Sequence, residues 1–133
     1  MKEDIEFIKV QDIAVCAIPE SEDNFDLWHV YILNLKDKAI DGVLISSKGY
    51  GKKDGNKVAT SVFRHHIEKM EAQSFSKIES LHTELLGLAN EFWVSFWQDG
   101  VIRDKKYIFV RESIRKENLT QIPLINKKGV MIK

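Results

Sequence analysis

Apolar positions along the chain fall into short runs that are rich in β-branched and aromatic residues, and turn-forming residues separate these runs. Spacing of this kind is typical of an all-β sandwich or barrel. The runs that we expect to form strands cover residues 11–18, 26–35, 42–47, 58–70 and 73–79, with a hairpin over residues 92–110. The run at 26–35 is apolar on both faces, which predicts a central strand or one covered on both sides.

The strongest local signal is Asp99-Gly100, which lies between two β-rich runs. Glycine readily adopts the positive φ of a tight hairpin turn, and aspartate tolerates it. With a two-residue loop, one face carries Phe92, Val94, Phe96 and Tyr107, and the other carries Trp93, Trp97, Ile102 and Lys106. A loop one residue longer would exchange these partners, because one step of register turns every side chain to the other face. The hairpin is therefore predicted, and its register stays open.

Residues 71–88 fit two interpretations. The apolar residues at helical spacing are Phe75, Ile78, Leu81, Leu85 and Leu88. The stretch SFSKIES within the same segment alternates as a strand does. We expect a short strand at 73–79 followed by a helical turn near 81–87, and a single longer helix is the alternative.

The chain is long enough, at 133 residues, for one domain with its own core. We therefore expect residues 1–133 to form a single antiparallel β-sandwich, immunoglobulin-like in style, with about seven strands. Beyond the hairpin the chain becomes polar and then carries the apolar residues Leu119, Ile122, Leu124 and Ile125. These residues predict that the segment 110–133 forms a polar turn and a tail that packs on the body of the domain.

Composition indicates a soluble protein, with 44% hydrophobic and 30% charged residues. No apolar run approaches the roughly 20 residues needed to span a bilayer. The N-terminal sequence MKEDIEFIKV is acidic and lacks the basic and then apolar layout of a signal peptide. We therefore expect a cytoplasmic location and no membrane partner.

Charge is unevenly distributed although the formal net charge is zero. Residues 1–26 carry two lysines and eight acidic residues, whereas residues 101–133 carry nine basic and three acidic residues. The two ends can neutralise one another within the fold or across a dimer contact. The alternative is a basic C-terminal surface that receives an acidic partner.

Signals for catalysis or metal binding are weak. His65 and His66 are adjacent, so in a strand they point to opposite faces and cannot easily bind one metal ion. We expect His65 to be buried and hydrogen-bonded, and His66 to be more exposed. Cys16 lies in the apolar stretch IAVCAI, which favours a buried, unreactive thiol. No nucleophile or zinc-ligand spacing is present, so we predict no catalytic residue, no metal and no cofactor.

Two segments are candidates for binding. Residues 48–57, KGYGKKDGNK, are expected to form a glycine-rich loop, and its possible anion-binding residues are Lys48, Lys52, Lys53 and Lys57. The hairpin carries Trp93, Trp97 and Tyr107, which are residue types favoured at protein interfaces. The same aromatic side chains with interleaved lysines could also stack on single-stranded nucleic acid.

Five longer stretches of the chain are distinctive in their order: WHVYILN at 28–34, VLISSKGYG at 43–51, NEFWVSFWQDG at 90–100, DKKYIFV at 104–110 and IPLINKKGV at 122–130. Together they resemble a small family of bacterial β-sandwich proteins for which no functional residue is established. Some relatives carry the label of a phenylalanyl-tRNA synthetase subunit. The present chain is much shorter than a synthetase catalytic core and has no arginine-centred ATP-binding motif, so the resemblance implies a fold and no active site.

Three functions follow as hypotheses. The first is a non-enzymatic protein-interaction module, whose partner could be a second copy of the chain in a homodimer. The second is a nucleic-acid-binding accessory protein, for tRNA for example, that uses the lysine-rich segment 48–57 and the basic C-terminal segment. The third is a small enzyme or ligand-binding domain whose site the sequence does not reveal.

Overall fold

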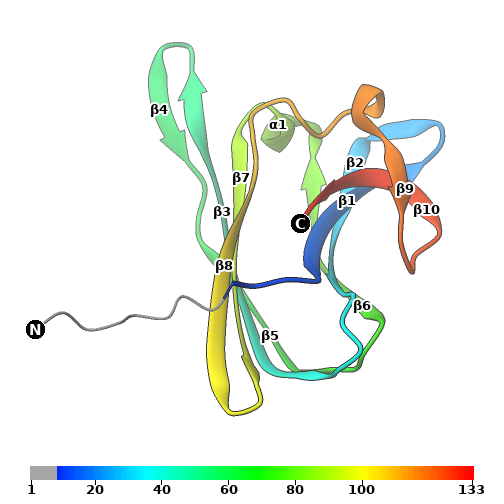
Figure 1. Ribbon diagram of the computed structural model, residues 1–133. Coiled ribbons are helices and arrows are strands. Elements are labelled where there is room, and N and C mark those ends of the chain that lie inside the picture. Colours follow the sequence, from blue (N-terminus) through cyan, green and yellow to red (C-terminus); the bar gives the residue numbers. More distant parts are fainter. Residues whose placement is uncertain (1–8) are drawn as a thin grey trace, which may run out of the picture.

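The computed structural model describes residues 9–133, which form two antiparallel sheets that lie face to face (Figure 1). The first sheet has the strand order β6-β2-β1-β10-β9, with β6 Ser74–His82, β2 Asn24–Asn34, β1 Ile13–Ser21, β10 Lys127–Ile132 and β9 Thr120–Ile122. The second has the order β4-β3-β7-β8, with β4 Asn56–Ala59, β3 Ile40–Lys53, β7 Ala89–Gln98 and β8 Val101–Phe109. β5, Phe63–Met70, pairs with β3 on the same edge as β4.

The all-β sandwich predicted from the hydrophobic pattern is confirmed, while its immunoglobulin-like style stays a prediction. Ten strands are present in the described part of the chain, where about seven were expected. The expected strand 58–70 is two strands, β4 and β5, and the C-terminal tail forms β9 and β10. The tail packs on the body as predicted, since Ile122 is buried and β10 pairs with β1. No helix in residues 9–133 is long and apolar enough to cross a membrane.

The segment 71–88 adopts the expected strand followed by a helical turn. β6 ends at His82 and α1 covers only Thr83–Leu86, so the longer helix is excluded. The predicted loop at 48–57 is wrong, because these residues form the end of β3, the turn Asp54-Gly55 and the start of β4. Both turn residues have positive φ, 52° and 80°, which suits a tight two-residue hairpin.

The main core lies between the two sheets. Its largest fully buried side chains are Trp28, Phe92, Phe96, Tyr107 and Phe109. β2 is central in its sheet, between β1 and β6, as its two apolar faces predicted. Two buried groups that need hydrogen-bond partners have them, since the Trp28 indole N–H donates to the Phe25 carbonyl at 2.9 Å and the Tyr107 hydroxyl donates to the Ile13 carbonyl at 2.7 Å.

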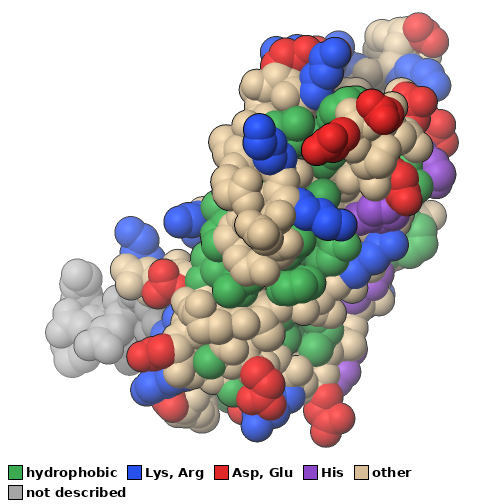
Figure 2. Space-filling model, turned by 90° about the vertical axis from the view of Figure 1, so that its right-hand side faces the viewer, with side chains coloured by type: hydrophobic (Ala, Val, Ile, Leu, Met, Phe, Trp, Pro, Cys, Tyr) green, Lys and Arg blue, Asp and Glu red, His purple; other side chains and the backbone are tan. Residues whose placement is uncertain are grey.

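A smaller apolar cluster covers the outer face of the first sheet. Hydrophobic side chains gather in the middle of this side of the molecule, with charged and histidine side chains around them (Figure 2). The buried members of the cluster are Ala14, Cys16, Ile18, Leu33 and Ile122. Tyr31, Leu35, Ile125 and Met131 pack over them. Cys16 is thus a buried thiol, as its apolar neighbours predicted.

Candidate functional site

The two adjacent histidines point to opposite faces of β5, as the strand geometry predicted. His65 is paired with Ile45 and faces the other sheet, where its Nε2 lies 3.1 Å from Glu79 Oε1. His66 is exposed and is paired with Leu44 on the outer face. The predicted burial of His65 is wrong in degree, because 27% of its side chain is exposed. β5 is an edge strand, which leaves its inward-facing side chains incompletely covered.

Ser47, His65 and Glu79 meet between the two sheets, and this cluster has the residue types of a hydrolase triad. Its geometry differs, because the Ser47 hydroxyl donates to Glu79 Oε1 at 2.5 Å and His65 contacts the same oxygen. No hydrogen bond joins Ser47 to His65 within the described residues, so the serine–histidine contact of such a triad is missing from this structure. The cluster joins the two sheets, because Ser47 and His65 lie on the second sheet and Glu79 lies on the first.

The outer face of the second sheet carries an exposed apolar surface. We call it the tryptophan face and define it by Leu44, Trp93, Trp97, Ile102 and Ile108. Residues directly opposite one another in a sheet share a face. One row across the strands is Ser46, Trp93 and Lys106; the next is Leu44, Ser95 and Asp104; and Trp97 lies opposite Ile102. The apolar side chains therefore occupy neighbouring rows and form one surface.

The hairpin register places the tryptophans as the two-residue loop predicted. Trp93 and Trp97 are 44% and 46% exposed, and Ile102 is 55% exposed. The prediction of Tyr107 as an interface residue is wrong, because Tyr107 is paired with Phe92 and is fully buried in the core. Its ring belongs to the inner face, and burial raises the pKa of its hydroxyl. The stacking platform that would have included Tyr107 therefore reduces to the two tryptophans.

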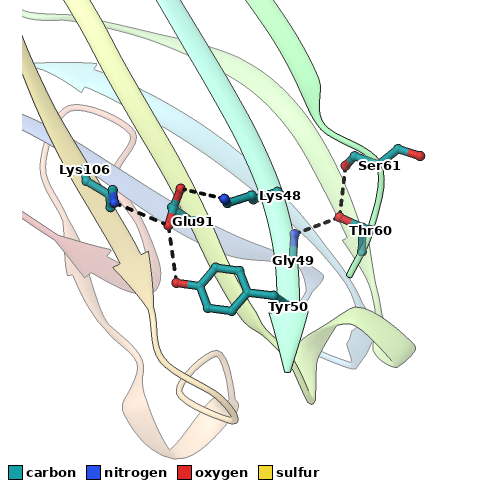
Figure 3. Close-up of polar contacts among 7 residues, drawn as sticks. All are labelled: Lys48, Gly49, Tyr50, Thr60, Ser61, Glu91 and Lys106. Carbon is teal, nitrogen blue, oxygen red and sulfur yellow. Dashed lines mark hydrogen bonds and ion pairs between the residues drawn. The ribbon is translucent and has the colours of Figure 1, made fainter. Parts of the chain in front are cut away.

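A buried carboxylate lies at one end of the tryptophan face (Figure 3). Glu91 of β7 exposes only 9% of its side chain. The Nζ atoms of Lys48 on β3 and Lys106 on β8 lie 3.9 Å from its two oxygens, and the Tyr50 hydroxyl donates to it at 3.3 Å. The two strands on either side of β7 thus supply the partners that a buried negative charge requires.

This carboxylate also orients the adjacent aromatic side chains. The Lys106 ammonium lies 4.9 Å from the centroid of the Trp93 ring, and Lys48 lies 5.8 Å from that of Tyr50. Burial, followed by the negative charge and the hydrogen bond of Glu91, raises the pKa of Tyr50. The phenol therefore stays neutral at physiological pH and remains a donor to Glu91. Glu91 thus positions the Lys106 ammonium, and this ammonium contacts the Trp93 ring at the edge of the tryptophan face.

The four candidate lysines do not converge on one anion site. Lys48 is paired with Glu91, whereas Lys52 and Lys57 lie opposite one another near the end of the β3–β4 hairpin. Lys53 pairs with Asn56 beside the turn. Within residues 9–133, no group of three or more His, Cys, Asp or Glu side chains could hold a metal ion.

Sequence reasoning missed Leu44, Glu91 and Ile108 as members of the site. Strand alternation contained a signal for two of them, because Glu91 and Ile108 occur at even spacing from Trp93 and Lys106. The contact of Glu91 with Lys48 depends on the pairing of β3 with β7, which joins residues far apart in sequence.

Comparison with protein-family models, with curated proteins and with solved structures finds no match to this chain. The resemblance to a bacterial β-sandwich family therefore stays a prediction.

Proposed function

We propose that this protein is a non-enzymatic interaction module whose tryptophan face binds a second copy of the same chain. The observation that carries the proposal is the exposure of two tryptophans and three aliphatic residues in neighbouring rows of one sheet face. Large contiguous apolar surfaces are uncommon on monomers, and tryptophan is enriched among residues that dominate binding energy.

The charges around the tryptophan face favour a second copy as the occupant. Arg64 lies on this face at the β5 side, and Asp104 lies on it at the β8 side. A twofold axis parallel to the strands would bring β5 of one copy over β8 of the other, with each Arg64 one row along the strand from Asp104 of the other copy, within reach of the long arginine side chain. Lys106 on β8 is balanced by Glu91 within its own chain. A face with both signs of charge suits self-association, and a net charge of zero adds no repulsion between copies.

Sedimentation velocity over a range of protein concentrations tests the dimer. We expect the wild type to dimerise and Ile102→Arg to raise the dimer dissociation constant at least about tenfold, because it places a charge in an apolar interface. The control is Leu124→Arg, which changes an exposed apolar residue in the turn after β9 and should leave the constant unchanged.

A charge exchange tests the arrangement of the two copies. Arg64→Asp and Asp104→Arg should each weaken the dimer, and the double variant should restore it. A wild type that stays monomeric at high concentration, or an Ile102→Arg variant that associates as tightly as the wild type, would overturn the proposed function.

A second function, binding of single-stranded nucleic acid, is favoured by one observation on the β3–β4 hairpin. This hairpin extends away from the rest of the molecule (Figure 1), and Lys52 lies directly opposite Lys57. Like charges in that position repel one another, and a polyanion would relieve the repulsion. We expect any RNA affinity, measured by fluorescence anisotropy, to fall steeply as salt rises and to decrease in Lys52→Gln. The absence of binding at low salt would exclude this function.

A further inference from the structure

The first sheet forks where β10 separates from β1. The two strands pair at Val15–Ile132, Cys16–Met131 and Ala17–Val130, and the pairing ends there. Pro19 follows shortly in β1, and proline has no N–H to donate to a neighbouring strand. Beyond the fork β1 remains paired with β2, whereas β10 pairs with β9. Each arm of the fork therefore keeps one paired neighbour although the two arms separate from one another.

The base of the fork is tightly closed by Gly129. A Cβ atom at this position would lie 2.6 Å from the Ala17 carbonyl oxygen and 3.0 Å from Ile18. Only glycine fits such a close approach of two backbones. The strands thus touch at the base and diverge above it, which produces a defined groove.

The groove between the arms has a volume of about 570 Å³. This is within the range of small-molecule binding sites. Its apolar lining includes Ile18, Phe25 and Leu119. Glu20 and Glu22 line it on the side of β1 and the β1–β2 turn, and Lys127 and Lys128 line it on the side of β10.

The opposed charges of the two walls do not neutralise one another. Within residues 9–133 no ion pair joins these carboxylates to these lysines, and Glu20 instead contacts His29. The groove therefore presents a negative wall and a positive wall, with an apolar floor between them. A ligand that matches it needs an ammonium group at one end, a carboxylate at the other and apolar groups between.

We propose that this groove binds a short peptide with free termini and apolar side chains, of about dipeptide size. The peptide ammonium lies against Glu22 and the peptide carboxylate against Lys128, while the side chains rest on Phe25 and Leu119. This site is on the first sheet and is independent of the tryptophan face, which belongs to the second. The groove is a small-ligand site whether or not the protein dimerises.

Isothermal titration of the full chain with the dipeptide leucyl-phenylalanine tests the site. We expect saturable binding, and we expect the N-acetylated dipeptide and the dipeptide amide each to bind about tenfold more weakly, because each lacks one terminal charge. Glu22→Gln should weaken binding of the free dipeptide by a similar factor but should not weaken binding of the N-acetylated dipeptide further. Lys128→Gln should likewise weaken binding of the free dipeptide but should not weaken binding of the dipeptide amide further.

The control variant Lys69→Gln alters a lysine on β5 of the second sheet, outside the groove lining, and should bind the dipeptide as the wild type does. Chemical-shift changes in an amide NMR spectrum should be centred on residues 18–25 and 119–128. Absence of binding at millimolar dipeptide, or equal affinity for a dipeptide blocked at both ends, would overturn the proposal. A monomeric protein that still binds the dipeptide would contradict only the proposed dimer.

Discussion

Trp28→Ala is expected to lower the free energy of unfolding by about 3–5 kcal/mol. Trp28 is fully buried in the main core, where its ring centroid lies 6.0 Å from that of Phe25. Truncation leaves a cavity in a closely packed interior and removes the hydrogen bond from the indole N–H to the Phe25 carbonyl. Urea denaturation followed by circular dichroism measures the change, because the far-ultraviolet signal does not depend on this tryptophan alone.

Trp93→Ala makes the same chemical change on the outer face of the second sheet and provides the control. This side chain is 44% exposed, so its loss should cost less than about 1.5 kcal/mol. Both variants are compared at concentrations below the dimer dissociation constant, because Trp93 also belongs to the proposed interface. Equal costs for the two substitutions would contradict the assignment of Trp28 to the core and Trp93 to the surface.

The outward position of Trp93 follows from a local rule, the turn of its hairpin, although the sequence alone left the register of that hairpin open. Asp99-Gly100 determines a two-residue turn, and Asp99 and Gly100 have φ values of 53° and 75°. The turn determines the register, and the register determines the face of every side chain in the hairpin. The same register places Tyr107 with Phe92, so the interface role of Tyr107 was inconsistent with the pairing that the turn predicts.

The β3–β4 hairpin was missed although it contains the same turn signal, Asp54-Gly55. Glycine and lysine are poor strand residues, and their abundance in 48–57 suggested a loop. The structure gives the glycines another role. A Cβ at Gly51 would lie 3.1 Å from a methyl carbon of Leu88, and one at Gly49 would lie 3.2 Å from the Asn90 amide oxygen. Here glycine permits close packing within a strand, which depends on residues about 40 positions away.

The candidate sites were predictable to different degrees for the same physical reason. The two tryptophans share a strand, so alternation within that strand places them together. The buried Glu91 cluster and the groove at the fork each join segments distant in sequence. The groove depends on the separation of β10 from β1, which Pro19 and Gly129 allow but which neither residue signals alone.

Cys16 provides a measurable test of the apolar cluster on the outer face of the first sheet. Burial raises the pKa of this thiol to about 12, and a backbone hydrogen bond at Tyr31 opposes the shift in part. In the unfolded chain a cysteine titrates near pH 8.5. Because the folded pKa is the higher one, the stability due to the neutral thiol is fully present below about pH 8.5 and is lost as pH rises toward 12.

We therefore expect the wild type to lose about 2 kcal/mol more stability than Cys16→Ala between about pH 7 and about pH 10. Denaturant titrations of both proteins across this range measure the difference, because the other ionisable groups are common to both proteins. Val15→Ala is the matched control, since it truncates the preceding residue of β1 without removing a titrating group. Its cost should stay constant with pH. Parallel pH profiles for the wild type and Cys16→Ala would mean that the thiol is accessible to water and that the cluster does not seal this face of the sheet.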